Sequence, residues 1–106
     1  MHWLIELRGV ECLNGLGSAL PCVVVVQPSG ASTGVRVAWD QSWPASSSAI
    51  LAMPVSRDGS SMGATQKANV TRPSQGQPGL ADFWWSDTVG QAGSRPWAFA
   101  LHAVTE

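Results

Sequence analysis

Apolar and polar side chains alternate along several short segments of the chain, and turn-forming residues separate these segments. Alternation with a period of two is typical of a strand with one buried face, and no window of ten or more residues has a helical period. Strand-like composition occurs at residues 2–12, 20–27, 34–40, 49–55, 64–72, 80–87 and 97–104. Segment 80–87 also fits one turn of helix, although a strand is favoured. The pattern predicts an all-β fold, a small antiparallel β-sandwich or barrel of about seven short strands.

The first two segments have features of their own. In the first, Trp3, Ile5 and Leu7 share one face, and the apolar phase shifts after Gly9, which predicts a β-bulge at that glycine. The second contains four consecutive valines at 23–26, so that β-branched side chains project from both faces of the sheet. We expect both faces of this strand to be covered, either within the chain or by a neighbouring subunit.

The chain has two cysteines, Cys12 and Cys22. If the first two strands form a hairpin about Leu16 and Gly17, the cysteines fall nearly opposite each other and a cross-strand disulfide is geometrically feasible. Two buried free thiols fit the sequence equally well.

The stretch 60–79 is polar and contains Pro73, Pro78 and several glycines. Only residues 64–72 within it could form a weak edge strand. We therefore predict that 60–79 is mainly a long exposed loop or arm on the single domain formed by residues 1–106.

Charged residues make up 12% of the 106 residues, and the formal net charge is -1. The six cationic residues are spread singly along the chain, whereas nucleic-acid binding needs clustered cations. We therefore expect no nucleic-acid partner. A surface with so little charge is poorly protected against self-association, which favours a protein that works in an assembly, as a homo-oligomer or beside other subunits.

The longest apolar run, residues 19–26, is about a third of the length of a membrane-spanning helix. The N-terminal residues as written lack the basic region, apolar stretch and cleavage site of a signal peptide. We expect neither membrane insertion nor a signal peptide, and the pattern leaves the cellular location open.

Two patterns resemble catalytic or metal-binding chemistry. Residues 59–63 match the spelling G-x-S-x-G, and Asp87 and His102 follow in the chain order of a hydrolase triad. That motif needs a strand-to-helix turn in a doubly wound sheet, so we interpret 59–63 as a Gly/Ser turn. The cysteines and histidines lack the short paired spacings of a zinc site. We expect no enzyme activity, metal or cofactor.

Tryptophan is the most informative residue type, with six copies and no tyrosine. Three tryptophans have inward phases and are predicted to lie in the core: Trp3, Trp39 and Trp97. Trp84 and Trp85 are adjacent, and neighbouring strand residues face opposite sides, so only one of them can join a single core. Trp43 lies in a Ser-Trp-Pro loop. We predict partner or ligand contacts at Trp43, Trp84 and Trp85, because exposed indole rings are common at binding surfaces.

The function that these features favour is a non-enzymatic structural subunit that acts through protein contacts. A small component of a virus or phage particle, such as a capsid-decorating or tail protein, would suit them. The alternative is a carbohydrate-binding module in which Trp43 and either Trp84 or Trp85 stack on sugar rings. In that alternative the sugar hydroxyls would bond to polar side chains at Asp40, Gln41 or Asp82.

Overall fold

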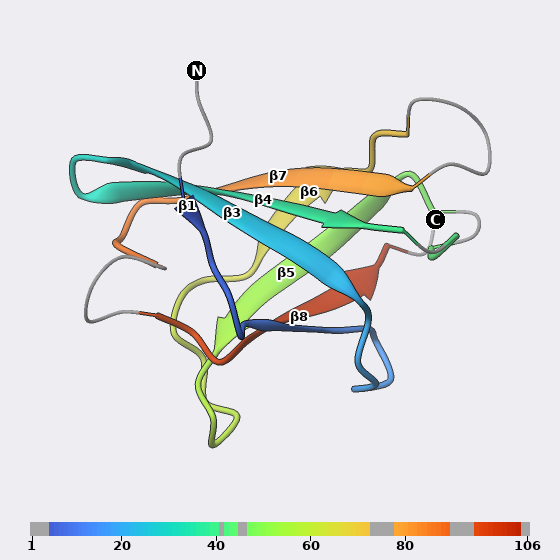
Figure 1. Ribbon diagram of the computed structural model, residues 1–106, viewed down its shortest axis with the longest axis horizontal. Coiled ribbons are helices and arrows are strands. Elements are labelled where there is room, and N and C mark those ends of the chain that lie inside the picture. The colour runs from blue at the N-terminus through green and yellow to red at the C-terminus, as the bar shows by residue number, and fades with distance from the viewer. Residues whose placement is uncertain (1–4, 41, 45–46, 73–77, 90–94, 105–106) are drawn as a thin grey trace.

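The computed structural model describes residues 5–40, 42–44, 47–72, 78–89 and 95–104, which form eight strands and no helix. The first sheet has the order β1-β3-β4-β7, comprising β1 (Ile5–Glu6), β3 (Cys22–Ser29), β4 (Ser32–Trp39) and β7 (Gly79–Trp85). The second sheet has the order β2-β8-β5-β6, comprising β2 (Glu11–Leu13), β8 (Ala98–Ala103), β5 (Ala49–Val55) and β6 (Gln66–Asn69). Figure 1 shows the two sheets packed as layers. The prediction of an all-β sandwich or barrel is confirmed, and the structure has the sandwich form with eight strands where about seven were expected.

The sheets are antiparallel except at one pair. β2 runs parallel to β8, while every other strand pair is antiparallel. β3 and β4 form the longest hairpin, which turns through Gly30 with a φ of 61°. The valines of this hairpin alternate as a half-buried strand requires, because Val24 and Val26 face the core while Val23 is 49% exposed. The expectation that both faces of β3 are covered is therefore wrong for the chain by itself.

The phase shift at Gly9 marks a change of sheet instead of a bulge. β1 pairs with β3 in the first sheet, whereas β2 pairs with β8 in the second. Gly9 lies between them with a φ of 78°, in a region that glycine adopts without steric cost. Leu7 is buried as predicted, but Ile5 is 46% exposed because β1 is an edge strand, and Trp3 lies outside the described residues.

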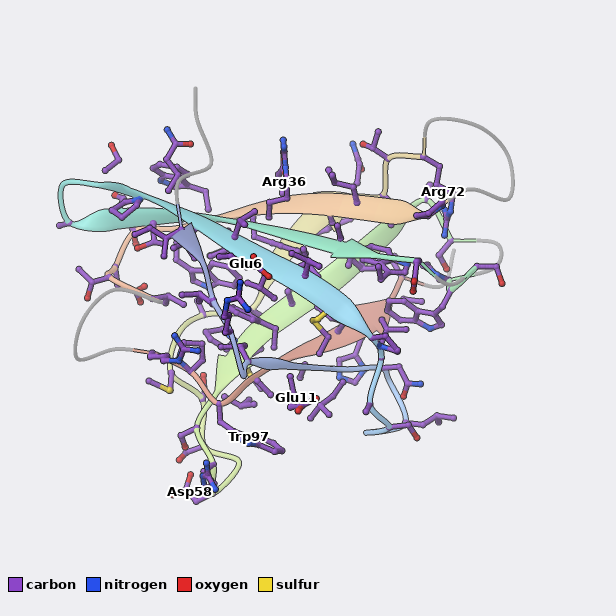
Figure 2. The ribbon with its side chains drawn as sticks, in the orientation of Figure 1. Glu6, Glu11, Arg36, Asp58, Arg72 and Trp97 are labelled. Atoms are coloured by element: carbon purple, nitrogen blue, oxygen red, sulfur yellow. A yellow bond between two sulfur atoms is a disulfide. The ribbon has the colours of Figure 1, made fainter. Side chains whose placement is uncertain are left out.

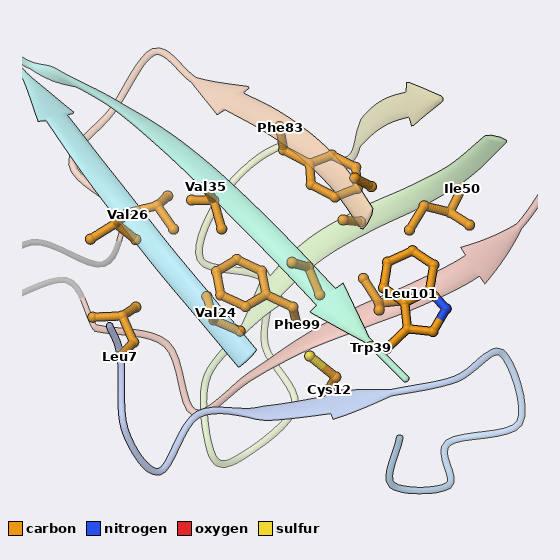
Figure 3. Close-up of a cluster of buried hydrophobic side chains, with 14 of the residues drawn as sticks. Leu7, Cys12, Val24, Val26, Val35, Trp39, Ile50, Phe83, Phe99 and Leu101 are labelled. Atoms are coloured by element: carbon orange, nitrogen blue, oxygen red, sulfur yellow. The ribbon is translucent and has the colours of Figure 1, made fainter. Parts of the chain in front are cut away.

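Aromatic rings from both sheets meet in the core (Figure 3). Trp85 of β7 lies between Phe83 and Phe99, with ring centroids 5.7 Å apart in each pair. Phe99 belongs to β8, so this contact joins the two layers. Trp39 is also in the core, at 2% exposure, and its predicted burial is confirmed.

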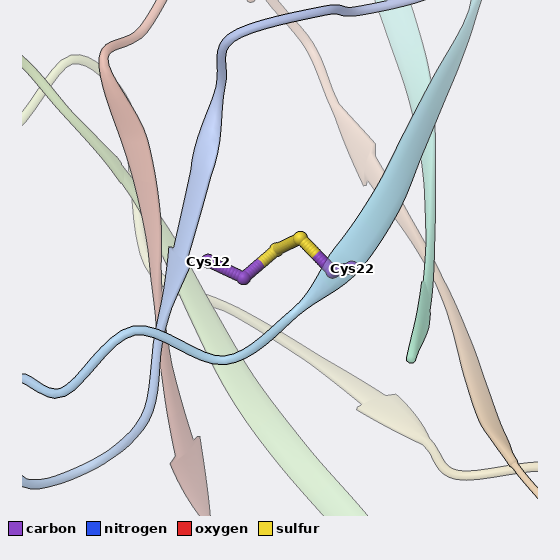
Figure 4. Close-up of a disulfide and its surroundings, with 2 residues drawn as sticks. All are labelled: Cys12 and Cys22. Carbon is purple, nitrogen blue, oxygen red and sulfur yellow. A yellow bond between two sulfur atoms is a disulfide. The ribbon is translucent and has the colours of Figure 1, made fainter. Parts of the chain in front are cut away.

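Cys12 and Cys22 form a disulfide that joins the two sheets (Figure 4). Cys12 lies on β2 and Cys22 on β3, and their Cα atoms are 6.2 Å apart. The hairpin turn considered about Leu16 and Gly17 does form, since Leu13 bridges Ala19 in antiparallel orientation. It does not continue into a pair of β2 with β3, because β2 pairs with β8 and β3 pairs with β1 and β4. The sequence fitted a disulfide and two buried free thiols equally well, and the structure has the disulfide.

The weak edge strand that the sequence allowed within 64–72 forms as β6, at the edge of the second sheet. β6 pairs with β5, and Ala68 packs against the core while Lys67 and Asn69 are exposed. Thr71 then forms a bridge to Leu80 of β7. The chain thus joins the edge of the second sheet to the edge of the first, and residues 73–77 of this stretch lie outside the described part.

Candidate functional site

The outward side of the first sheet is the candidate site. Alternate residues of its three longer strands point away from the core: Val23, Val25 and Gln27 on β3, Gly34, Arg36 and Ala38 on β4, and Leu80, Asp82 and Trp84 on β7. We call these nine residues the outer face. The strand register arranges them in three rows, which are Val23-Ala38-Leu80, Val25-Arg36-Asp82 and Gln27-Gly34-Trp84.

Large apolar side chains are exposed at both ends of the outer face. Val23 is 49% exposed in one end row, and Trp84 is 43% exposed in the other. Ala38 and Leu80 in the row of Val23, and Val25 in the middle row, are half-buried. A single exposed apolar residue is ordinary, but several on one sheet face commonly mark an interaction site. Here the two apolar end rows are separated by the row that contains Arg36 and Asp82.

The centre of the outer face carries one ion pair. Arg36 Nε donates to Asp82 Oδ1 at 2.8 Å, and a terminal guanidinium nitrogen of Arg36 donates to Asp82 Oδ2 at 3.0 Å. These hydrogen bonds raise the pKa of Arg36 above its ordinary value. Both side chains are partly exposed, at 34% and 44%, and Figure 2 shows Arg36 projecting away from the sandwich. Arg36 belongs to β4 and Asp82 to β7, so the ion pair links these two neighbouring strands.

A shallow groove of about 320 Å³ extends the outer face beyond its Val23 row. It is lined by Pro21, Cys22, Val23, Ala38, Trp39, Asp40 and Pro78. Gly79 lies under the Trp39 ring, where an added Cβ would come within 2.5 Å of Trp39 Cζ2. The groove is mainly apolar, with one carboxylate from Asp40.

The structure separates the two adjacent tryptophans as the strand pattern requires. Trp84 lies on the outer face, whereas Trp85 is 1% exposed and donates its indole N–H to Ala64 O at 2.6 Å. Trp85 therefore belongs to the core and not to a contact surface. Of the predicted pair, only Trp84 is available to a partner.

Trp43 is held in the loop after β4. Its ring packs edge-on against Trp39, with centroids 5.8 Å apart, and its carbonyl oxygen accepts a hydrogen bond from the Trp39 indole. Arg72 donates to the carbonyl oxygens of Trp43 and Pro44, both at 3.1 Å. The Trp43 ring is half-buried, so most of its interactions are within the chain.

The residues predicted for a sugar site do not come together. Trp43 contacts Trp39, which lies five positions along β4 from Gly34, the register partner of Trp84. At about 3.4 Å per residue this separates the two ends by roughly 17 Å. Asp82 is engaged by Arg36, and Gln41 lies outside the described residues.

Besides Ile5 and Val23, sequence reasoning missed the exposure of Leu16 and Trp97. Leu16 is 91% exposed at the tip of a loop that Asn14 organises, since Asn14 Oδ1 accepts from Leu16 N at 2.9 Å and Ser18 N at 3.2 Å. Trp97 is 36% exposed, and its predicted burial is wrong. It lies just before β8, at the end of the sandwich, and lines a second shallow pocket with Met62. Figure 2 shows Trp97 on the side of the molecule away from Arg36.

The G-x-S-x-G segment is a turn between two strands, as interpreted from its composition. It follows β5 and precedes β6, and Ser61 Oγ donates to Gly63 O at 2.7 Å. The neighbouring Asp58 organises the turn by accepting hydrogen bonds from the hydroxyls of Ser56 and Ser60 and from Ser60 N. These bonds stabilise the carboxylate form and lower the pKa of Asp58 to about 2.

This arrangement predicts a measurable acid titration. The stabilisation that the turn gains from the carboxylate should be present above the ordinary pKa of 3.8 and be lost as the pH falls towards about 2. In an NMR titration of the Asp58 carboxyl carbon, we expect a midpoint near 2, and Ser56→Ala should raise it. A midpoint near 3.8 in the unaltered chain would contradict the hydrogen bonds described.

No group of three or more His, Cys, Asp or Glu side chains that could hold a metal ion occurs in the described part of the chain. A helix with the length and apolarity needed to cross a membrane is likewise not found among the described residues.

Comparison with known proteins finds no match to this chain among models of protein families, curated proteins or solved structures.

Proposed function

We propose that this chain is a non-enzymatic structural subunit that assembles with neighbouring protein chains, copies of itself included, through the outer face. The observation that carries the proposal is the exposure of Val23 and Trp84, at 49% and 43%, on a sheet whose other side forms the core. About half of each of these two side chains remains in contact with water in the single chain. Burying them against a partner would remove apolar surface from water, which is the main favourable contribution to protein association.

The charge of the chain supports the same proposal. A net charge of -1 over 106 residues gives little electrostatic repulsion between copies. A component of a virus or phage particle, such as a capsid-decorating or tail protein, is the setting we propose, because every subunit there has permanent neighbours.

The test is the solution mass of the chain, measured by light scattering over a concentration series. We expect a mass that rises above the 11.1 kDa of one chain. Trp84→Ala should move the association to concentrations at least about tenfold higher, because a few aromatic side chains commonly contribute most of the binding energy of an interface.

Trp97→Ala is the matched control, since Trp97 has a similar exposure of 36% but does not belong to the outer face. It should leave the association unchanged. A mass of one chain at every concentration, or an equal effect of both substitutions, would contradict the proposal.

A further inference from the structure

The outer-face residues of β4 and β7 differ in a regular way. β4 contributes two small residues and a cation, which are Gly34, Ala38 and Arg36. β7 contributes two large apolar residues and an anion, which are Trp84, Leu80 and Asp82. In each row a small residue of β4 is paired with a large one of β7, or the cation is paired with the anion.

A two-fold rotation converts this pairing within the sheet into a pairing between sheets. If the axis runs parallel to the strands, between β4 and β7, it carries β4 of one copy over β7 of the other and keeps each row in place. Arg36 then lies over the partner copy's Asp82, and Ala38 lies over its Leu80. Gly34 lies over its Trp84, and the same contacts occur a second time with the copies exchanged.

We infer that the partner of the outer face is a second copy of this chain, packed face to face about that two-fold axis. The inference rests on the proposed assembly through the outer face and specifies its partner and its symmetry. Each large side chain meets a small one, so a single interdigitated layer can fill the spacing of about 10 Å between packed sheets.

The Arg36–Asp82 ion pair favours a two-fold axis between β4 and β7 over one between β3 and β4. With the axis between β4 and β7, two arginines and two aspartates alternate, and no charge is buried without an opposite one. An axis between β3 and β4 would place each Arg36 over the other copy's Val25, because these two residues share a row. Desolvating a charge against an aliphatic side chain is strongly unfavourable.

Glu6 fits the same arrangement. It lies on β1 in the row of Arg36 and Asp82, as the register partner of Val25. Rotation about the axis carries both β3 and β1 beyond the edge of the other copy's β7, since both lie on the side of β4 away from β7. The face-to-face overlap therefore comprises β4 and β7 with Trp84, and Val23 on β3 lies at its margin. The Glu6 carboxylate therefore stays outside the area where β4 and β7 of the two copies face each other, and it adds no unpaired charge there.

The test uses two variants whose charges are complementary. Arg36→Asp leaves two acidic side chains at the centre of the face, and Asp82→Arg leaves two basic ones. Each variant should remain monomeric at concentrations where the unaltered chain is dimeric, with a dissociation constant raised at least about tenfold, because like charges then face each other across the axis. An equimolar mixture, with one variant isotopically labelled, should form dimers of one copy of each in native mass spectrometry.

Lys67→Glu is the control for a change of charge elsewhere, since Lys67 is exposed on β6 of the second sheet. It should dimerise like the unaltered chain, and circular dichroism should show that all variants are folded. Variants that assemble alone as well as the unaltered chain, or a mixture that stays monomeric, would overturn the inference. In either case a Trp84-dependent assembly of the unaltered chain would leave the proposed function standing, whereas an unaltered chain that never assembles would refute both.

Discussion

Trp85→Ala is expected to lower the free energy of unfolding by about 3 to 5 kcal/mol. The Trp85 ring is 1% exposed and lies between Phe83 and Phe99, so its removal leaves a cavity where the two sheets meet. The substitution also removes the hydrogen bond that the indole N–H donates to Ala64 O, which adds a smaller loss because Ala64 is exposed to water. Equilibrium unfolding in urea, at a concentration where the chain is monomeric, measures the change.

Trp84→Ala is the matched control, since the two residues are adjacent and identical in type. Trp84 is 43% exposed on the outer face, so its removal from the monomer should cost less than about 1 kcal/mol. Equal losses for the two substitutions would mean that the packing of Trp85 in the core is not as described. The same two variants thus separate a role in stability from a role in association.

Loss of the disulfide is expected to lower the free energy of unfolding by about 3 kcal/mol. Cys12 and Cys22 are ten positions apart in the sequence and connect the two sheets. In the chain-entropy account, closing a loop of this length restricts the unfolded chain by about that amount. The double substitution Cys12→Ala and Cys22→Ala, compared with the unaltered chain in urea unfolding, measures the contribution.

Addition of a reductant provides the control for this second prediction. It should destabilise the unaltered chain by a similar amount and leave the double variant unchanged. If the double variant unfolds at the same urea concentration as the oxidised chain, the link between β2 and β3 does not contribute to stability as expected.

The sequence predicted much of the candidate site through a simple geometric rule. Adjacent residues on a strand face opposite sides, so the pair Trp84 and Trp85 had to place one ring outside the core. The sequence analysis left open which ring, although Asp82 shares the face of Trp84 and Phe83 shares the face of Trp85 in an alternating strand. That choice depends on the register with β4, which pairs Trp85 with Thr33 and Trp84 with Gly34.

Strand order and register also explain why the sequence analysis did not find the Arg36–Asp82 ion pair or the match between the outer-face residues of β4 and β7. Arg36 and Asp82 are 46 positions apart, and nothing local indicates that their strands are neighbours. The order β3-β4-β7 brings together two segments that are separated by the whole of β5 and β6. Contacts of this kind follow from strand order, which periodicity does not encode.

The sequence by itself determined the fold class and the inward position of Trp39 on β4, because alternation along a strand is a local property that burial imposes on each segment separately. Only the tertiary structure decided that Gly9 moves the chain from one sheet to the other and that Cys12 and Cys22 join the sheets. It alone also placed Trp97 outside the core. These features depend on which strands are neighbours and where the layers end, and long-range packing between segments sets both.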